Sequence, residues 1–392
     1  MVPTGSGLRV SGFGTLGVVH ANAPAGWGFL RSIDQAANDG GTRADIDSRI
    51  GLQLNYSANS QFELVGQLLA ARRANNAPAN SAVEWAFAAY RPTSDITLRV
   101  GRLNVDQFVM SDYRNVGFAY LYVRPPVEFY GLIPTSLDGA DLSRTWNGED
   151  SHWRAKAFGG RAKISGVDLT QVFGLTLARE AGGLLVRAGL SRAKFPNGFP
   201  GAKPLLDGLD QLRALPIPSI AAEASTLRTR LDYAGTSLMY ATLGATYEQA
   251  QWQWAAELTR ASAGPSAAIS AGYASVARRF DPVTLFGIAS GATSNASVLA
   301  MPAWGAMLAP IFGPVAAQQA QGLAQGATTA VNRTMRQSTY SLGARWDIHP
   351  QVALKLQWDH VRILANGAQL WSNATASPGR ADLATVTMDF VF

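Results

Sequence analysis

Apolar and polar side chains alternate with a period of two along most of this chain, and the pattern is clearest in its last eleven residues, 382–392. One set of alternate positions holds Ala384, Val386, Met388, Phe390 and Phe392, and the other holds Thr385, Thr387 and Asp389. This spacing predicts a strand with one apolar and one hydrated face. The pattern recurs without enough helices to cover the apolar faces, which favours strands that contact lipid.

The composition supports this reading. Only 15% of the 392 residues are charged and 47% are hydrophobic, whereas soluble domains carry about 25% charged residues. The absence of cysteine excludes disulfide scaffolds and thiolate metal sites. The net charge of +6 is small and dispersed, so it indicates small anionic partners and not nucleic acid.

The connections between the predicted strands alternate between short and long. About sixteen strands of about 8 to 14 residues are predicted, close to the length that crosses a bilayer. The short turns lie at 58–60, 92–95, 148–150, 180–183, 250–251, 281–282 and 349–350, and the long connections at 21–43, 104–137, 195–234, 296–336 and 364–381. Short inner turns and long outer loops predict one antiparallel transmembrane β-barrel over residues 1–392, with both termini on the periplasmic side.

Charges fall on one face of the predicted strands. Leu52, Leu54 and Tyr56 alternate with Arg49, Gln53 and Asn55; Val83, Trp85 and Phe87 flank Glu84; Leu342 and Trp346 alternate with Ser341 and Arg345; Leu354, Leu356 and Trp358 alternate with Lys355, Gln357 and Asp359. A lipid-facing Arg at the bilayer midplane costs about 2–4 kcal/mol, so the charged face is expected to line a watery lumen.

Two other folds agree less well with this pattern. A soluble β-sandwich or propeller also alternates, but it lacks loops that are long at one end only. A membrane-spanning helix within 296–317 is opposed by Pro302, Pro310 and Pro314, each of which lacks a backbone donor. The opening residues show no basic segment followed by an apolar run, so we expect a mature form with a new initiator Met1.

The chain resembles the Gram-negative trimeric porin family over its whole length. The residues that carry the resemblance are the first strand at 8–19, the strand at 96–105 that leads into a long third outer loop, and the closing residues 389–392. The resemblance implies a sixteen-stranded homotrimeric barrel in the outer membrane, surrounded by lipid and lipopolysaccharide. It also implies that the third loop folds into the lumen and that Phe392 is recognised by the outer-membrane insertion machinery. The fifth and seventh outer loops depart from the general porins in being long and apolar.

The third loop, at 104–137, is dense in aromatic residues and is expected to lie against the barrel wall. Its charged residues are Asp106, Asp112, Arg114, Arg124 and Glu128, and the expected lumenal bases of the wall are Arg49, Arg99, Arg154, Lys156, Arg187, Arg345 and Lys355. Bases opposed to loop carboxylates in a narrow channel select ions by sign. Because bases outnumber acids, we expect a mild anion preference, while local pairing of these charges remains an alternative.

Several other motifs have simpler explanations. Gly12, Gly14 and Gly17 match a dinucleotide fingerprint but lie inside a predicted strand, where small residues more readily serve close packing. The four histidines show no metal-ligand spacing. Asp34, Asp39, Asp45 and Asp47 cluster near the first outer loop and could bind a structural Ca²⁺, although such loops are usually solvated turns.

The predicted function is passive diffusion of small anionic or neutral hydrophilic solutes and ions, without catalysis or cofactor. One alternative is a channel selective for small aromatic or amphiphilic carboxylates, lined by third-loop aromatics and the apolar outer loops. The others are a plugged barrel with an adhesive or binding role and an outer-membrane hydrolase. Helical spacing at 205–215, 220–231 and 301–330 predicts that the fifth and seventh loops cap the mouth or pack on one another.

Overall fold

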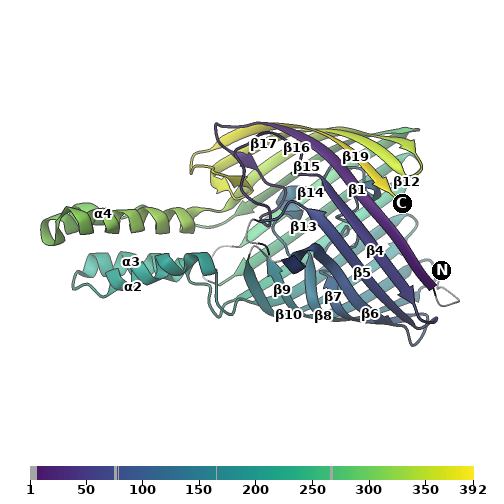
Figure 1. Ribbon diagram of the computed structural model, residues 1–392, viewed down its shortest axis with the longest axis horizontal. Helices are drawn as coiled ribbons and strands as arrows, with labels where there is room; N and C mark the ends of the chain where they lie inside the picture. Colours follow the sequence, from purple (N-terminus) through teal and green to yellow (C-terminus); the bar gives the residue numbers. More distant parts are fainter. Residues whose placement is uncertain (1–6, 75–76, 78, 165, 265–267) are drawn as a thin grey trace.

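The computed structural model describes residues 7–74, 77, 79–164, 166–264 and 268–392, and the expected initiator Met1 lies outside them. Sixteen long antiparallel strands form a closed barrel (Figure 1). Closure comes from β1 (Gly7–Asn22), which pairs with β4 (Arg49–Ser57) on one side and with β19 (Gly379–Val391) on the other. The predicted barrel is therefore confirmed.

The remaining elements follow in chain order. The other barrel strands are β5 (Phe62–Ala71), β6 (Val83–Tyr90), β7 (Ile96–Asn104), β8 (Ser136–Asn147), β9 (His152–Ile164), β10 (Val167–Ala181), β11 (Leu184–Lys194), β12 (Ser237–Gln249), β13 (Trp252–Ala263), β14 (Ile269–Phe280), β15 (Val283–Ser294), β16 (Met335–His349) and β17 (Val352–Ala368). The short strands are β2 (Gly28–Phe29), β3 (Gly41–Arg43) and β18 (Trp371–Ser372), and the helices are α1 (Val127–Tyr130), α2 (Lys203–Arg213), α3 (Pro218–Leu231) and α4 (Trp304–Asn332). Single 3₁₀ turns lie at Ala79–Ala82, Gly117–Ala119 and Pro200–Ala202.

Burial is inverted relative to a soluble protein, as β19 illustrates. Val386 on its apolar face is 55% exposed, whereas Thr385 and Asp389 on its polar face are fully buried. The same inversion holds in β17, where Leu356 is exposed and Lys355 is buried. An apolar outer wall around a polar interior is the arrangement required of strands in lipid.

Three local predictions were wrong. The strand expected to begin at residue 44 begins at Arg49, because residues 44–48 form a turn after β3. A register shift at the start of β6 turns Trp85 and Phe87 toward the lumen, where the Arg99 guanidinium lies over the Phe87 ring. Long and short connections also do not alternate strictly, since β9 ends at Ile164 and β10 begins at Val167.

The glycines of β1 make room for the C-terminal aromatic residues. A Cβ at Gly12 would lie 2.2 Å from the Phe392 ring, and a Cβ at Gly14 would lie 2.3 Å from the Phe390 ring. The backbones of Gly12 and Phe392 exchange two hydrogen bonds, of 2.8 and 3.0 Å. Packing, and not nucleotide binding, therefore accounts for these glycines.

The helices of the fifth and seventh outer loops project away from the barrel (Figure 1). α2, α3 and α4 share their own apolar core, which includes Leu209, Ile220, Leu227 and Trp304. α4 is broken at Gly313, and Gly305 of its first part donates a hydrogen bond to Gln321 of its second part. The loops thus pack on one another, as predicted. Among the described residues, no helix combines the length and the apolar character needed to span a membrane.

Candidate constriction site

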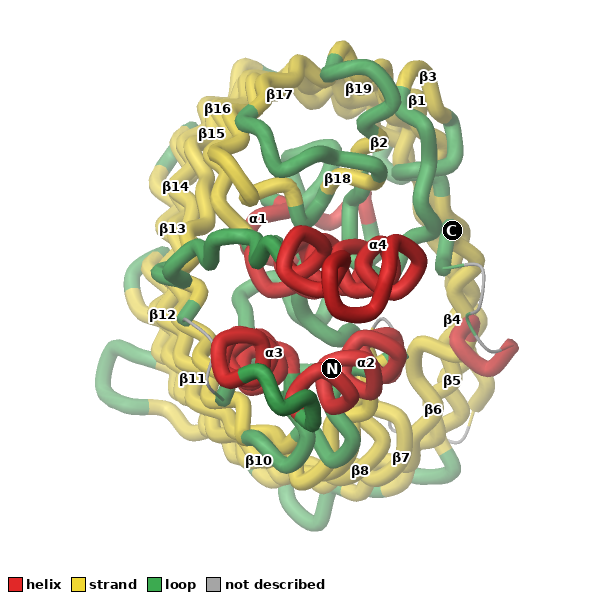
Figure 2. The backbone as a smooth tube through the Cα atoms, turned by 90° about the vertical axis from the view of Figure 1, so that its left-hand side faces the viewer, coloured by secondary structure: helices red, strands yellow, loops and turns green. Residues whose placement is uncertain are grey.

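The third outer loop, residues 105–135 and here called L3, folds into the barrel and crosses its lumen. Its backbone and side chains contact wall strands on opposite sides: Thr242 of β12 donates to the carbonyl of Gln107, and Asn115 donates to Glu84 of β6. Figure 2 looks into the barrel from the side of the projecting helices and shows loop segments and α1 inside the ring of strands. The predicted inward fold of L3 is therefore observed.

A buried carboxylate on β13 holds the outgoing and returning arms of L3 together. Glu257 accepts hydrogen bonds from the backbone N–H of Val109, at 2.9 Å, and from the Tyr130 hydroxyl. It also accepts a 2.7 Å hydrogen bond from Tyr273 of β14. Glu257 thus joins Val109 and Tyr130, which lie in the two arms of L3, to one site on the wall. Glu257 is absent from the predicted set, because in the sequence it is only one acid on one strand.

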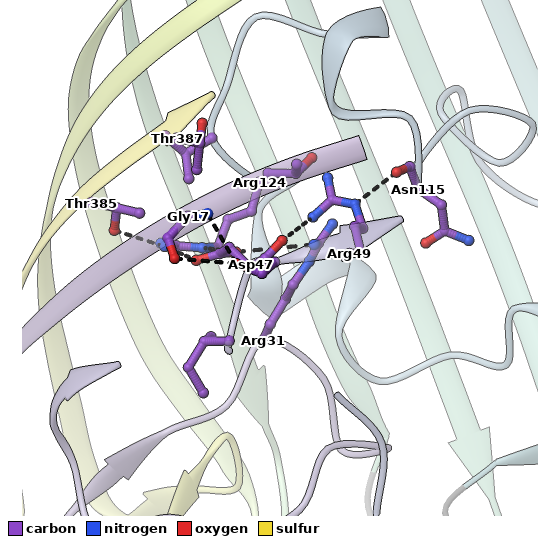
Figure 3. A network of polar contacts seen from close by, with 12 residues as sticks. Gly17, Arg31, Asp47, Arg49, Asn115, Arg124, Thr385 and Thr387 are labelled. Carbon is purple, nitrogen blue, oxygen red and sulfur yellow. Dashed lines mark hydrogen bonds and ion pairs between the residues drawn. The ribbon is translucent and has the colours of Figure 1, made fainter. Parts of the chain in front are cut away.

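Arg124 forms the central ion-pair network of the site (Figure 3). Its guanidinium donates to Asp47 at 3.0 and 2.6 Å, to Asp359 of β17 at 2.8 Å and to the Thr385 hydroxyl of β19 at 2.7 Å. All four side chains are buried. Arg124 thus joins the middle of L3 to the first loop and to the last strands.

Electrostatic complementarity keeps this network ionised. Burial alone would raise the pKa of Asp47, but the nearby charge of Arg124, aided by Arg31 and Arg49, outweighs burial and lowers the pKa below its usual value. Burial would lower the pKa of Arg124, but the charges of Asp47 and Asp359 raise it instead. Because each charge is satisfied by the other, removing one partner is far more costly than removing both.

Three of the expected lumenal bases bind L3 instead of facing open water. Lys355 donates to the carbonyls of Gly117 and Tyr122 at 2.6 and 2.8 Å, and it pairs with Asp389 at 3.1 Å. Arg345 donates to the carbonyls of Phe118 and Tyr120, at 2.8 and 3.0 Å. Arg49 donates to the carbonyl of Asn115 at 2.7 Å. All three point inward, as predicted, but each satisfies loop backbone that would otherwise be buried without partners.

Glu128 and Arg114 also have supporting positions. Glu128 accepts from Gln337, Thr339 and Ser290 on the neighbouring strands β15 and β16. Arg114 is buried and donates to the carbonyl of Pro134, which ties the two arms of L3 together. Burial lowers the pKa of Arg114. Neither residue is placed to contact a passing solute.

The aromatic residues of L3 pack against one another and against the barrel wall. Phe108, Phe129 and Tyr130 contact one another and reach Tyr240 of β12 and Tyr273 of β14. The same apolar cluster includes residues of the first and eighth outer loops, namely Trp27, Phe29, Leu370 and Trp371. β2 and β18, which carry Phe29 and Trp371, pair with each other. These two loops were not predicted to enter the barrel.

The remaining charged residues gather where L3 leaves β7. Asp106 pairs with Lys156 of β9 and with Arg187 of β11. Arg99 of β7 donates through Nε to both oxygens of Asp141 on β8, at 3.0 and 3.1 Å. Burial would raise the pKa of Asp106, but the charges of Lys156 and Arg187 lower it. This group, the basic cluster, consists of Arg99, Arg154, Lys156, Arg187, Asp106, Asp112 and Asp141.

Asp112 and Arg154 are the members of the basic cluster that stay substantially exposed. Their side chains are 45% and 38% exposed, and Arg154 Nη1 lies 3.8 Å from Asp112 Oδ2. Asp112 belongs to L3 and Arg154 to β9, so the loop and the wall face each other across this pair. The structure therefore brings together six of the predicted wall and loop charges here, namely Arg99, Arg154, Lys156, Arg187, Asp106 and Asp112. It places Arg49, Arg124, Arg345 and Lys355 in a separate anchoring network.

The acidic residues of the first loop do not converge on one point. Asp45 pairs with Arg43 and Arg72, Asp47 with Arg124, and Asp39 accepts from Asn373. Within the described part of the chain, no three His, Asp or Glu side chains are grouped so that they could hold a metal ion.

Comparisons with known proteins agree with the architecture. No family model matches the sequence, and no curated protein matches it. Among solved structures, the chain is similar to an anion-selective porin from Comamonas acidovorans, with a TM-score of 0.54 and 13% identity over 99% of this chain and 100% of the other. It is also similar to Salmonella typhi OmpF in complex with daunomycin, with a TM-score of 0.52 and 13% identity over 99% and 98% of the two chains.

A third similar structure is the trimer form of OmpT, an outer membrane protein of Vibrio cholerae, with a TM-score of 0.52 and 12% identity over 98% and 99% of the two chains. Each likeness extends over the complete barrel at low sequence identity, so it concerns the fold. Together with the apolar outer wall, the polar interior and the inward L3, these likenesses lead to one conclusion. The chain has the fold of the Gram-negative outer-membrane porins.

Proposed function

We propose that this protein is a passive diffusion channel of the outer membrane for small hydrophilic solutes and ions, with a mild anion preference. The proposed passage runs beside the exposed ion pair of Asp112 on L3 and Arg154 on β9. The observation that carries the proposal is the basic cluster, in which four cations lie beside three carboxylates and one ion pair, Asp112 with Arg154, stays exposed. No residue is assigned a catalytic role.

The proposed passage lies in one sector of the barrel. The Glu257 and Arg124 networks hold L3 against β13 to β19, whereas the exposed charges of the basic cluster lie on the side of β7 to β9. A narrow, partly desolvated gap strengthens the effect of fixed charges on passing ions. The excess of one cation therefore supports a mild preference and not strict selectivity.

A path for aromatic carboxylates through the L3 aromatics is less well supported. Phe108, Phe129 and Tyr130 are buried against one another, and the helices of the fifth and seventh loops keep a separate apolar core. Solute-binding aromatic surface would have to be exposed. We further propose a homotrimer, on the basis of the fold it shares with a structure described as a trimer form.

Reversal potentials across planar bilayers under a salt gradient test the proposal. The unmodified protein is expected to favour the anion, Arg154→Gln to shift the reversal potential toward the cation, and Asp112→Asn to shift it further toward the anion. Arg102→Gln is the matched control, since Arg102 pairs with Asp138 on the outer wall. A cation-selective unmodified channel, or equal potentials in all four proteins, would refute the assignment.

A further inference from the structure

The outer wall of the barrel carries a cluster of arginines beside a groove. The cluster, called the outer arginine cluster, consists of Arg260 on β13, Arg336 on β16, Arg362 on β17 and Arg380 on β19. The first three line a groove of about 930 Å³ together with Leu243, Leu258, Ser270, Gly272, Gly291, Thr293, Ser338 and Leu364.

Strand register places this groove on the lipid-facing side. Leu258 of β13, which is 63% exposed, lies opposite Gly272 of β14. Gly272 lies opposite Gly291 of β15, Gly291 opposite Ser338 of β16, and Ser338 opposite Arg362. Because alternate residues face opposite sides of a sheet, and directly opposed residues face the same side, this whole row faces outward.

A second outward row runs parallel to the first and nearer to the outer loops. Arg260 lies opposite Ser270, and Ser270 lies opposite Thr293. In the groove, Gly272 and Gly291 form a floor of small residues. The hydroxyl groups of Ser270 and Thr293 lie nearer to the outer loops, and Arg260 and Arg362 lie on the two sides. Since β13 ends at Ala263, Arg260 lies three positions from the outer end of its strand, at the depth of the outer-leaflet headgroups.

Among the residues that the structure describes, the arginines of this cluster have no acidic partner. Within the part of the chain that the structure describes, none of them forms an ion pair, and the Nε atom of Arg336 is buried without a hydrogen-bond partner. Arg362 and Arg380 lie directly opposite each other, an arrangement of like charges that is unfavourable without a counter-charge. Among the outward carboxylates, Asp138 pairs with Arg102 and Asp168 pairs with Lys163. Asp382 lies 2.9 Å from Nδ1 of His360 on the neighbouring strand.

From this geometry we propose that the groove binds a phosphorylated lipid of the outer leaflet, the class to which lipopolysaccharide belongs. Guanidinium groups bind phosphate oxygens with paired hydrogen bonds, and Ser270 and Thr293 supply further donors. An acyl chain fits the floor of Gly272 and Gly291 between Leu258 and Leu364. The inference rests on the proposed placement in the outer membrane, but it does not depend on ion selectivity.

Charge decides between a lipid and a second copy of the chain as the occupant. A second copy that covered the groove would need several free carboxylates at the membrane depth of the arginines. The three outward carboxylates named above already have basic partners. An anionic lipid supplies the missing charge and the apolar tail together. This combination favours the lipid.

Native mass spectrometry of the purified full-length protein tests the proposal, with diphosphoryl lipid A and its dephosphorylated form as probes. The triple variant Arg260→Gln, Arg336→Gln and Arg362→Gln is expected to bind the diphosphoryl lipid about tenfold or more weakly, since each lost phosphate contact is charge-assisted. Ser338→Trp fills the groove without removing charge and is expected to weaken binding as well. Arg278→Gln is the control, because Arg278 faces outward at the opposite end of the barrel, over Trp252.

Each other outcome overturns the proposal. Equal binding of the two lipid forms would show that the groove does not recognise phosphate. Displacement of the lipid by millimolar inorganic phosphate alone would indicate a simple anion site. Unchanged lipid binding combined with loss of oligomers in the triple variant would assign the groove to a second copy. Conductance is recorded on the same samples. Because none of the changed residues faces the lumen, the conductance should stay unchanged, so a loss of lipid binding can be told apart from a loss of channel function.

Discussion

Arg124 Nη1 in the middle of L3 lies 2.8 Å from Asp359 Oδ2 on β17, and the two residues are 235 positions apart in the chain. This contact is one arm of a network that also includes Asp47 and Thr385. The loop that defines the lumen is therefore held by buried charges, while its exposed charges face the proposed passage. Anchoring and selection are performed by different residues.

Replacing Arg124 should loosen L3. Arg124→Met leaves Asp47 and Asp359 buried without their cation, which is expected to cost about 3–5 kcal/mol of local stability. Single-channel recordings should show increased current noise, and proteases should cut within residues 105–135. Arg102→Gln, on the outer wall, should leave both measurements unchanged. A quiet and protease-resistant Arg124→Met channel would show that the network does not hold the loop.

Glu257→Ala should release both arms of L3 at once. The change leaves the Val109 N–H and the Tyr130 and Tyr273 hydroxyls unpaired, at a cost of about 1–3 kcal/mol for each buried group. Tyr273→Phe removes one partner only and should have a smaller effect on the thermal unfolding temperature. Equal unfolding temperatures for the two variants would contradict the shared role assigned to Glu257.

The two ion-pair anchors of L3, Asp47 with Arg124 and Asp106 with Lys156 and Arg187, should be insensitive to pH until strongly acidic conditions. The pKa values of Asp47 and Asp106 are lowered in the folded protein, so their stabilising contribution is complete above the unfolded value of about 3.9 and is lost as pH falls through the folded values. Protease resistance of L3 should be equal at pH 7 and pH 5 and should decrease only below about pH 4. Loosening between pH 7 and pH 5 would argue against ionised anchors.

The contact between Gly12 and Phe392 should be needed for closure of the barrel. Gly12→Val places a side chain where the Phe392 ring lies, 2.2 Å from the position of the added Cβ, so the ring must leave its place against β1. We expect a smaller fraction of heat-modifiable, folded barrel after refolding. Gly66→Ala is the control, because a Cβ at Gly66 meets nothing within 4 Å. Similar folded fractions in the two variants would exclude a packing role for Gly12.

Much of the architecture was predictable because lipid-facing and lumenal residues must alternate along each strand. Lys355 and Arg345 could be placed inside, and Leu356 and Trp346 outside, from period alone. Alternation fails where an extra residue is inserted, so the inward positions of Trp85 and Phe87 were not foreseen.

The roles of the charged residues were harder to predict than their faces. Asp112 and Arg154 stay exposed while Lys355 and Arg124 are buried, and this division depends on the path of L3, which has no periodic signature. Glu257 was missed for the same reason, since its partners Val109 and Tyr130 lie far from it in the sequence. The entry of the first and eighth loops depends on contacts between Phe29 and Trp371, which a local pattern does not encode.

The most direct test of the proposed passage uses the absence of native cysteine. Asp112→Cys introduces one thiol at the exposed end of L3, and Thr226→Cys introduces one on α3, away from the lumen. Modification with an anionic methanethiosulfonate reagent during single-channel recording should reduce the current of Asp112→Cys and leave that of Thr226→Cys unchanged. An unchanged current in Asp112→Cys, with complete labelling shown by mass, would mean that solutes do not pass beside Asp112.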